Sequence, residues 1–249
     1  MAVEVINQKT AKYFDEWGDD YSHAWKSVAR RRLSEFETGL VRRAIELAFK
    51  NFGGGCLKTL DIGVGTGRIT EVFLDYPVEH YGIDVSAVMV NHCQEKFKSV
   101  EKIKHLVVCD IVNPLPGDWG KFDVVSAIRV LPYTPQWREA LQNIYQTLKP
   151  GGIFVFNFPN KYSSAIIPKV VRGGKDQSCA SSYGELRRVL AEIGFAEVKI
   201  TGFARLLDVF YARCDSEFSA NILLTVEKFL RAVFGPTLFA RLLYCTCQK

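Results

Sequence analysis

Short apolar runs alternate with amphipathic stretches through the middle of the chain. The runs are rich in β-branched and aromatic residues and are bounded by glycine, proline or aspartate; they cover residues 59–62, 79–83, 105–109, 122–128 and 153–158. Such runs are typical of strands buried on both faces of a sheet. The pattern therefore predicts a sheet that is covered on both sides.

Helix patterns fill the spaces between these runs, and three of them carry start signals. They are expected over residues 87–97 after Ser86, 136–148 after Thr134 and Pro135, and 183–193 after Ser182. Serine and threonine side chains cap helix N-termini, and the glycines that follow the second and third helices are expected to end them. Strands that alternate with helices at this spacing indicate βαβ crossovers, a parallel sheet and a doubly wound α/β fold.

Two segments fall outside the alternation. Residues 5–49 read as helices with aromatic faces, and residues 215–234 form an amphipathic helix that precedes a last strand over residues 238–247. No internal repeat divides the chain. We therefore expect one domain over residues 1–249, made of a helical cap (1–52), a central core (53–160) and a second half (161–249) with a helical insertion at 215–235.

Composition narrows the class of protein. The 249 residues carry a net charge of +5, and 48% are hydrophobic and 12% aromatic, so the chain can bury a sizeable core and intrinsic disorder is excluded. The longest uncharged stretch, residues 150–160, is about half of what a bilayer requires, so no membrane span is expected. The mildly basic balance permits an anionic partner but does not demand nucleic acid.

The cysteines and the start of the chain favour a cytoplasmic protein. Seven cysteines, none of them in a Cys-x-x-Cys pair, are typical of reduced thiols, and no metal site is expected. No basic segment followed by an apolar one marks the first residues for secretion.

Residues 60–68 (LDIGVGTGR) carry the most informative motif. An apolar run ends, Gly63, Gly65 and Gly67 follow at alternate positions, and a helix is predicted from about Arg68. Glycines let the backbone turn sharply and let a ligand approach a helix N-terminus. Dinucleotide sites use the spacing Gly-x-Gly-x-x-Gly, so here the third glycine comes one residue early and Arg68 stands in its place. This spacing favours a ligand without a pyrophosphate over a nicotinamide dinucleotide.

Carboxylates end the second and third predicted strands. Asp84 is placed to accept hydrogen bonds from ribose hydroxyls, and Asp110 is placed to accept one from an exocyclic amine, with Ile111 behind the ring. The carboxyl ends of parallel strands meet at one edge, so both side chains are expected beside the point where the strand order reverses.

Taken together, residues 59–160 resemble a class I S-adenosylmethionine-dependent methyltransferase. The resemblance rests on the glycine motif, Asp84, Asp110, the FDVVSA strand and the LKPGG turn. It implies strand order 3-2-1-4-5-7-6 with strand 7 antiparallel and helices on both faces. It also implies S-adenosyl-L-methionine as cofactor, S-adenosyl-L-homocysteine as product, and residues 53–160 as the cofactor-binding core.

The same resemblance assigns cofactor contacts by position. They are Tyr21, Arg30, Asp61, Gly63, Gly65, Gly67, Asp84, Val85, Met89, Asp110, Ile111, Ala127, Ile128 and Arg129. The glycines would lie under the methionyl part, Asp84 would hold the ribose, and Met89 and Ile111 would border an adenine whose amine Asp110 binds. The backbone of residues 127–129 would lie below the sulfonium, and Tyr21 with one of the arginines 30–32 would approach the methionyl carboxylate.

Three residues are catalytic candidates. His23 is the one histidine of the cap and the candidate base, although a structural role is the alternative; a base is needed only where the nucleophile holds a proton. Arg129 could clamp a carboxylate or phosphate of the acceptor, or else pair with Glu139 or serve at the edge of the core. Tyr133 is the third candidate.

The acceptor is expected to be a small molecule or a lipid-linked metabolite, anionic or partly hydrophobic. The fourth strand lacks the Asn/Asp-Pro-Pro-Tyr/Phe and Pro-Cys signatures of base methylation, and no RNA-binding module is visible. A tRNA or protein methyltransferase, a cofactor-binding subunit without catalysis, and a nicotinamide-dependent oxidoreductase remain as alternatives. The protein is expected to be a monomer or a homodimer.

The late helix carries an apolar stripe that bears on the acceptor. Its members are Phe218, Ile222, Leu223, Val226, Phe229, Leu230 and Val233. We expect this stripe to pack onto the sheet; the alternatives are a pocket for a hydrophobic acceptor or contact with a membrane surface.

Overall fold

The computed structural model describes residues 2–17, 27–116, 118–163, 179–204, 214 and 216–249. Tyr21 and His23, two of the predicted site residues, lie outside these ranges. All that follows concerns the described residues.

The described strands form a single seven-stranded sheet. They are β1 (Leu57–Ile62), β2 (Val78–Asp84), β3 (Ile103–Val108), β4 (Phe122–Ala127), β5 (Leu148–Pro159), β6 (Ala196–Phe203) and β7 (Leu242–Gln248). Their order is β3-β2-β1-β4-β5-β7-β6, and β7 pairs antiparallel with both β5 and β6 while the other pairs are parallel. The predicted doubly wound fold and its strand order are confirmed.

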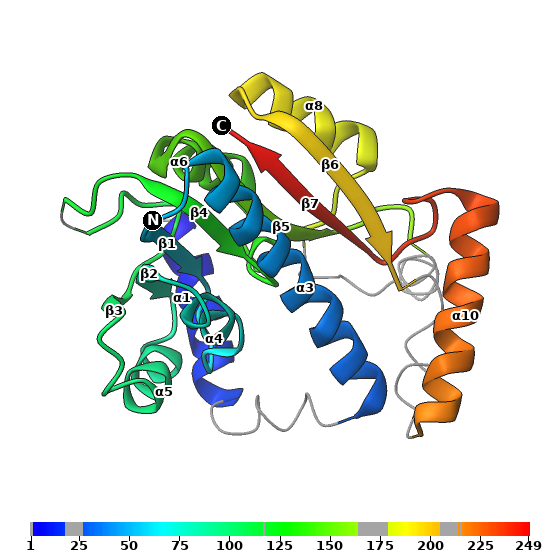
Figure 1. The fold of residues 1–249 in the computed structure, drawn as a ribbon, viewed down its shortest axis with the longest axis horizontal. Helices are drawn as coiled ribbons and strands as arrows, with labels where there is room; N and C mark the ends of the chain where they lie inside the picture. Colours follow the sequence, from blue (N-terminus) through cyan, green and yellow to red (C-terminus); the bar gives the residue numbers. More distant parts are fainter. Residues whose placement is uncertain (1, 18–26, 117, 164–178, 205–213, 215) are drawn as a thin grey trace.

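Helices cover both faces of the sheet (Figure 1). They are α1 (Ala2–Trp17), α3 (Val28–Asn51), α4 (Arg68–Leu74), α5 (Ala87–Lys96), α6 (Trp137–Thr147), α8 (Tyr183–Ile193) and α10 (Glu217–Phe234), with a 3-10 turn η1 (Leu131–Tyr133). Ile45 of α3 and Phe73 of α4 pack with Val124 of β4 on one face, and Leu141 of α6 and Leu190 of α8 pack on the other. Burial on both faces explains why the strands read as continuous apolar runs.

Two of the predicted helix caps are confirmed. Ser86 Oγ accepts the Met89 N–H (3.1 Å) at the start of α5, and Ser182 Oγ accepts the Glu185 N–H (3.1 Å) at the start of α8. Gly194, with φ = 111°, ends α8 as expected. These local signals succeed because a cap is satisfied by the first turn alone.

The third predicted cap is wrong. Helix α6 begins at Trp137, and Thr134 instead ends η1, where its N–H donates to Leu131 O (3.2 Å) and its hydroxyl donates to Val130 O (3.3 Å). Both polar groups of Thr134 are therefore engaged by the preceding turn. The LKPGG segment also differs, because β5 begins directly at Leu148.

The predicted packing of the late helix onto the sheet is also wrong. Phe218 is 76% exposed and Phe229 66% exposed, and the side chains of α10 that are buried are Ala220 and Glu227. In Figure 1, α10 stands at the edge of the molecule beyond β6, so its stripe has no sheet face to cover. The last strand is also shorter than predicted, since β7 begins at Leu242, although Cys245 and Cys247 do share a buried face.

No helix among the described residues is both long and apolar enough to cross a bilayer.

Candidate active site

A cavity of about 700 Å³, including its mouth, opens at the carboxyl edge of the sheet. It lies beside β1 and β4, where the strand order reverses, and strand ends, η1 and α1 line it. The lining residues are Thr10, Phe14, Ile62, Gly63, Gly65, Asp84, Val85, Met89, Cys109, Asp110, Ile111, Ile128, Arg129, Val130, Tyr133 and Thr134. Its position is that of a small-molecule site in an open α/β sheet.

The turn after β1 depends on two glycines. Gly63 has φ = 74°, and a Cβ at this position would overlap the Val130 side chain. Gly67 has φ = 85°, caps α4 and packs against Phe97, so it supports the turn from behind and does not line the cavity. The alternate glycines thus serve a left-handed backbone and a close approach of chain segments.

Gly63→Ala is expected to destabilise the protein by about 2–3 kcal/mol, because it adds an overlap with Val130 to the backbone strain. The matched control is Gly54→Ala: Gly54 has φ = 85° but nothing within 4 Å of the added Cβ, so only the backbone strain of about 1 kcal/mol applies. Urea unfolding measures both. Equal losses in the two variants would contradict the overlap.

Asp84 ends β2 with a carboxyl group fixed by backbone donors. Gly65 N–H donates to its Oδ2 (2.9 Å) and Ser86 N–H donates to its Oδ1 (3.0 Å). Burial raises the pKa of Asp84, and the N–H groups of Ser86, Gly65 and Val85 act against that rise. Each oxygen keeps a further lone pair, so the carboxyl can accept two more bonds from a diol.

Asp110 also lines the cavity, two residues after the carboxyl end of β3. Val112 N–H donates to its Oδ1 (3.1 Å), and its Oδ2 bonds to no residue that the structure describes. Burial raises its pKa. Asn143 of α6 secures the loop by donating to Ile111 O (3.0 Å) and Val112 O (2.9 Å). The open oxygen beside the buried Ile111 suits an amine on a flat ring.

Asp61 is buried beneath the cavity and not in its lining. Its carboxyl accepts hydrogen bonds from Ser126 Oγ (2.6 Å) and Thr70 Oγ1 (3.0 Å), which tie β1 to β4 and α4. Burial raises the pKa of Asp61 to about 7, although the hydrogen bonds from Ser126 and Thr70 and the nearby Arg68 act to lower it.

Arg129 lines the cavity and is paired with a buried acid that sequence reasoning missed. Its Nε and Nη2 each lie 3.0 Å from Glu37 Oε1, so its acidic partner is Glu37 of α3 and not Glu139. Glu37 is fully buried, and its carboxylate also accepts from Arg68 Nη2 (2.7 Å) and the Tyr244 hydroxyl (2.8 Å). The backbone at Arg129 has φ = 67°, and its N–H donates to Asn157 Oδ1 (2.5 Å).

Helix α1 closes one side of the cavity. Asp15 accepts from Ser86 Oγ (2.5 Å) at the start of α5, and Thr10 Oγ1 donates to Tyr133 O (3.4 Å) while the rings of Phe14 and Tyr133 meet edge to face. Sequence analysis predicted helices with aromatic faces here but gave none of these three α1 residues a role in the site. The aromatic faces were the available signal for Phe14, and no spacing marked Asp15.

The structure does not bring every predicted contact to the cavity. The predicted set that lines it is Gly63, Gly65, Asp84, Val85, Met89, Asp110, Ile111, Ile128, Arg129 and Tyr133. Asp61, Gly67 and Ala127 lie behind this lining, and Arg30 is exposed at the start of α3.

The lining fits a purine nucleoside. Two carboxyl groups with open acceptor positions stand where a ribose and an exocyclic amine would meet them, and the buried Met89 and Ile111 offer apolar surfaces for a ring.

Comparison with known proteins bears on the same region. Residues 60–154 match the family model described as a methyltransferase domain. Over these residues the chain is similar to methyltransferase domains. The matched segment contains Gly63, Asp84, Asp110 and Arg129, but α1 and Glu37 lie outside it.

Curated relatives share this domain within proteins of other lengths. A highly reducing polyketide synthase from Fusarium sp is 35% identical over 107 residues, 39% of this chain and 4% of that protein. A malonyl-[acyl-carrier protein] O-methyltransferase from Haemophilus ducreyi is 28% identical over 165 residues, 63% of this chain and 57% of that protein. The match therefore spans less than two thirds of either relative.

A solved structure extends the likeness of fold to nearly the whole chain. Magnesium protoporphyrin IX methyltransferase from Synechocystis, solved with S-adenosylhomocysteine bound, aligns with a TM-score of 0.63 and 15% identity. The alignment covers 97% of this chain and 99% of that one. The two chains thus share one fold.

Proposed function

We propose that this protein is an S-adenosylmethionine-dependent methyltransferase that moves a methyl group by in-line displacement to a small-molecule or lipid-linked acceptor. The observation that carries the proposal is the pair Asp84 and Asp110, which face one cavity behind the Gly63 turn. S-adenosylmethionine contains both a ribose and an adenine amine, and this pair offers one carboxyl group for each.

Binding and orientation are the main tasks of the chain in this reaction. When bound, S-adenosylmethionine supplies a methyl group on a positively charged sulfur, which is a good leaving group. Asp84 would accept hydrogen bonds from the ribose hydroxyls, Asp110 would accept one from the adenine amine, and Met89 and Ile111 would border the ring. Gly63, Gly65 and the backbone of Ile128 and Arg129 would hold the methionyl part. Alignment of this kind lowers the barrier by fixing the reacting atoms in advance.

We assign Phe14, Arg129 and Tyr133 of the cavity lining to the acceptor. Phe14 and Tyr133 exclude water from the transfer site. Arg129 presents a guanidinium to an anionic acceptor, with Glu37 fixing its direction. His23 remains the candidate base for an acceptor that must lose a proton, and Tyr21 and Arg30 remain candidate contacts for the methionyl carboxylate.

The names of two similar proteins support a small or carrier-bound acceptor, because they refer to malonyl-[acyl-carrier protein] and magnesium protoporphyrin IX. The seven cysteines, all free, support a reducing compartment such as the cytoplasm. A monomer or homodimer is part of the same proposal.

Calorimetry with S-adenosylhomocysteine tests the proposal. The protein is expected to bind this ligand and not NADH, and Asp84→Ala is expected to weaken binding by about 10- to 100-fold, the effect of losing charged hydrogen bonds worth about 1.5–3 kcal/mol. Asp75→Ala is the matched control, because Asp75 is an exposed carboxylate paired with Arg42 away from the cavity. Unchanged affinity in Asp84→Ala would refute the ribose assignment.

A further inference from the structure

The outer side of α10 is an apolar surface with no covering element among the described residues. Phe218, Ile222, Val226, Phe229 and Val233 recur at spacings of four and three residues, which places them on one side of the helix. All five are exposed, whereas Ala220 and Glu227 are buried on the opposite side. A helix that is apolar on its outer side as well as its inner one is unusual at a protein surface.

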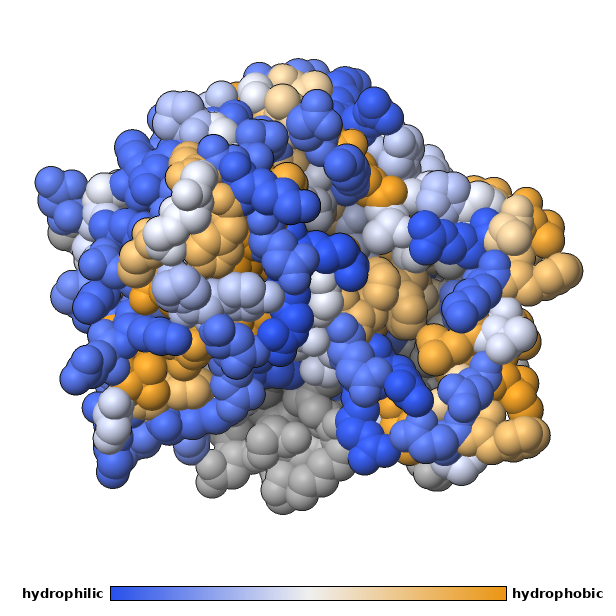
Figure 2. All heavy atoms as spheres, viewed as in Figure 1, coloured by the Kyte–Doolittle hydropathy of each residue, from blue (hydrophilic) through white to orange (hydrophobic). Residues whose placement is uncertain are grey.

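The apolar surface continues beyond the helix. Phe234, Leu238 and Phe239 are also exposed, and the rings of Phe234 and Phe239 meet edge to face at 5.5 Å. Figure 2 shows apolar residues gathered along the right-hand edge, where Figure 1 places α10. We call these eight residues the α10 patch. Exposed apolar side chains gathered in this number mark interaction sites.

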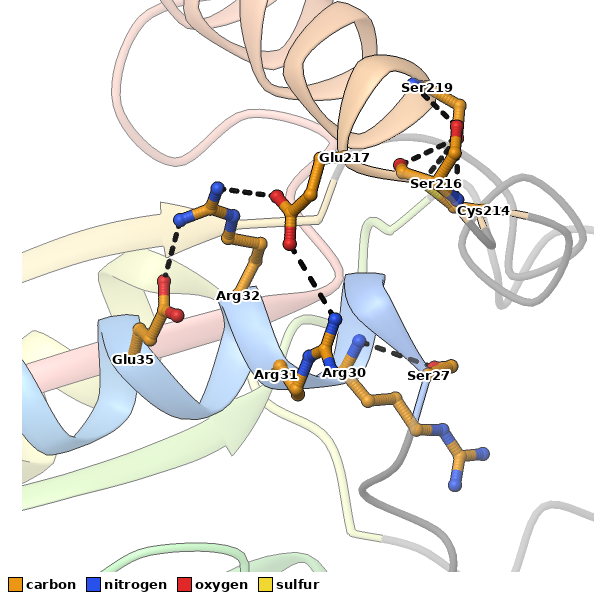
Figure 3. A network of polar contacts seen from close by, with 9 residues as sticks. All are labelled: Ser27, Arg30, Arg31, Arg32, Glu35, Cys214, Ser216, Glu217 and Ser219. Atoms are coloured by element: carbon orange, nitrogen blue, oxygen red, sulfur yellow. Dashed lines mark hydrogen bonds and ion pairs between the residues drawn. The ribbon is translucent and has the colours of Figure 1, made fainter.

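Helix α10 is fixed to the protein at its N-terminal end. Glu217 forms ion pairs with Arg32 (2.7 Å) and Arg31 (3.6 Å) of α3, as Figure 3 shows. Ser216 and Ser219 form a capping box, and Ala220 packs with Val28 and Cys214. The patch is therefore presented on an anchored element.

The exposed charges of α10 that form no ion pair with a described residue are basic. Lys228 and Arg231 are exposed on α10 and form no ion pair with a described residue, and Arg30 and Arg31 are exposed at the adjacent start of α3. The one exposed acid of α10, Glu217, is already paired with two arginines. An apolar surface with basic flanks is complementary to an anionic lipid surface, where apolar side chains enter the interface and cations meet the headgroups.

We propose that the α10 patch docks this protein on the surface of an anionic lipid bilayer. A second copy is the poorer occupant, because a symmetric contact would bring the basic flanks of the two copies together. Strand β6 runs parallel to β5, and α10 follows its carboxyl end, so the patch and the cavity lie toward the same edge of the sheet. The proposal goes beyond methyl transfer and does not depend on it.

Vesicle co-sedimentation of the full chain tests the proposal. The protein is expected to bind vesicles of equal parts phosphatidylcholine and phosphatidylglycerol, and this binding should weaken at high salt. Its affinity for vesicles of phosphatidylcholine alone should be lower by about ten-fold or more. Phe218→Gln combined with Phe229→Gln is expected to weaken binding to the anionic vesicles by about ten-fold or more.

Matched variants serve as controls for this test. Val108→Gln combined with Leu47→Gln also removes two exposed apolar side chains, on β3 and α3, and is expected to leave vesicle binding unchanged. Lys228→Glu is expected to weaken binding to the anionic vesicles alone. Melting temperatures within a few degrees of the parent establish that each variant is folded.

Three outcomes would overturn the proposal. One is no binding of the parent protein to anionic vesicles; another is equal binding by the parent and the Phe218→Gln, Phe229→Gln variant. The third is a dimer in size-exclusion chromatography that this variant converts to a monomer, without vesicle binding by either form.

Discussion

Glu37→Ala is expected to lower the free energy of unfolding by about 3–5 kcal/mol, as measured by urea unfolding. Glu37 is fully buried, and its carboxylate is shared by Arg68, Arg129 and the Tyr244 hydroxyl. Removing it leaves two partly buried guanidinium groups without this anion. Because Arg129 also lines the cavity, the affinity for an anionic acceptor should fall together with the stability.

The control for this variant is Glu35→Ala. Glu35 lies on the same helix, but its ion pair with Arg32 is exposed, and such pairs contribute about 0–1 kcal/mol. A loss in Glu37→Ala no larger than that in Glu35→Ala would show that the buried group does not stabilise α3 against the core.

Asp61→Asn is expected to remove a pH dependence of stability. The pKa of Asp61 is about 7 in the folded protein against an ordinary value of 3.8, so between these values the folded state holds a proton that the unfolded state has released. Stability therefore falls as pH rises through this window. The full shift corresponds to about 4 kcal/mol, of which about 2–3 kcal/mol falls between roughly pH 5 and 8.

Urea unfolding at several pH values measures this effect as the difference between the parent and Asp61→Asn. The asparagine can still accept a bond from Ser126 or Thr70, so the tie between β1 and its neighbours is partly kept. Asp75→Asn, at an exposed carboxyl, is expected to follow the parent curve. Parallel curves for the parent and Asp61→Asn would contradict the raised pKa.

The sheet and its ligand edge could be predicted because their signals are local. The strands are buried on both faces and therefore read as continuous apolar runs, and the Gly63 turn requires a backbone that only glycine adopts readily. Asp84 and Asp110 follow their strands directly, so the topology alone brings them to one edge. The division into cap, core and second half stays a prediction.

The features that sequence reasoning missed depend on distant partners. Glu37 looks like any acid on a helix until α3 is placed against β7, which brings Tyr244 to it. The apolar stripe of α10 predicts that this side of the helix is buried, but which side is covered depends on where the helix attaches to the protein. The ion pairs of Glu217 with the arginines of α3 attach it at the edge of the molecule. Thr134 failed as a cap because the preceding turn had already engaged its polar groups.

The position of Glu37 has a consequence for any chimaera built from this domain. The matched segment, residues 60–154, carries Arg68 and Arg129 but neither Glu37 nor Tyr244. A graft of that segment into another scaffold would import two guanidinium groups and leave their common counter-ion in the donor. A working transplant must therefore bring α3 and β7 with it, or supply an acid from the host at the same depth.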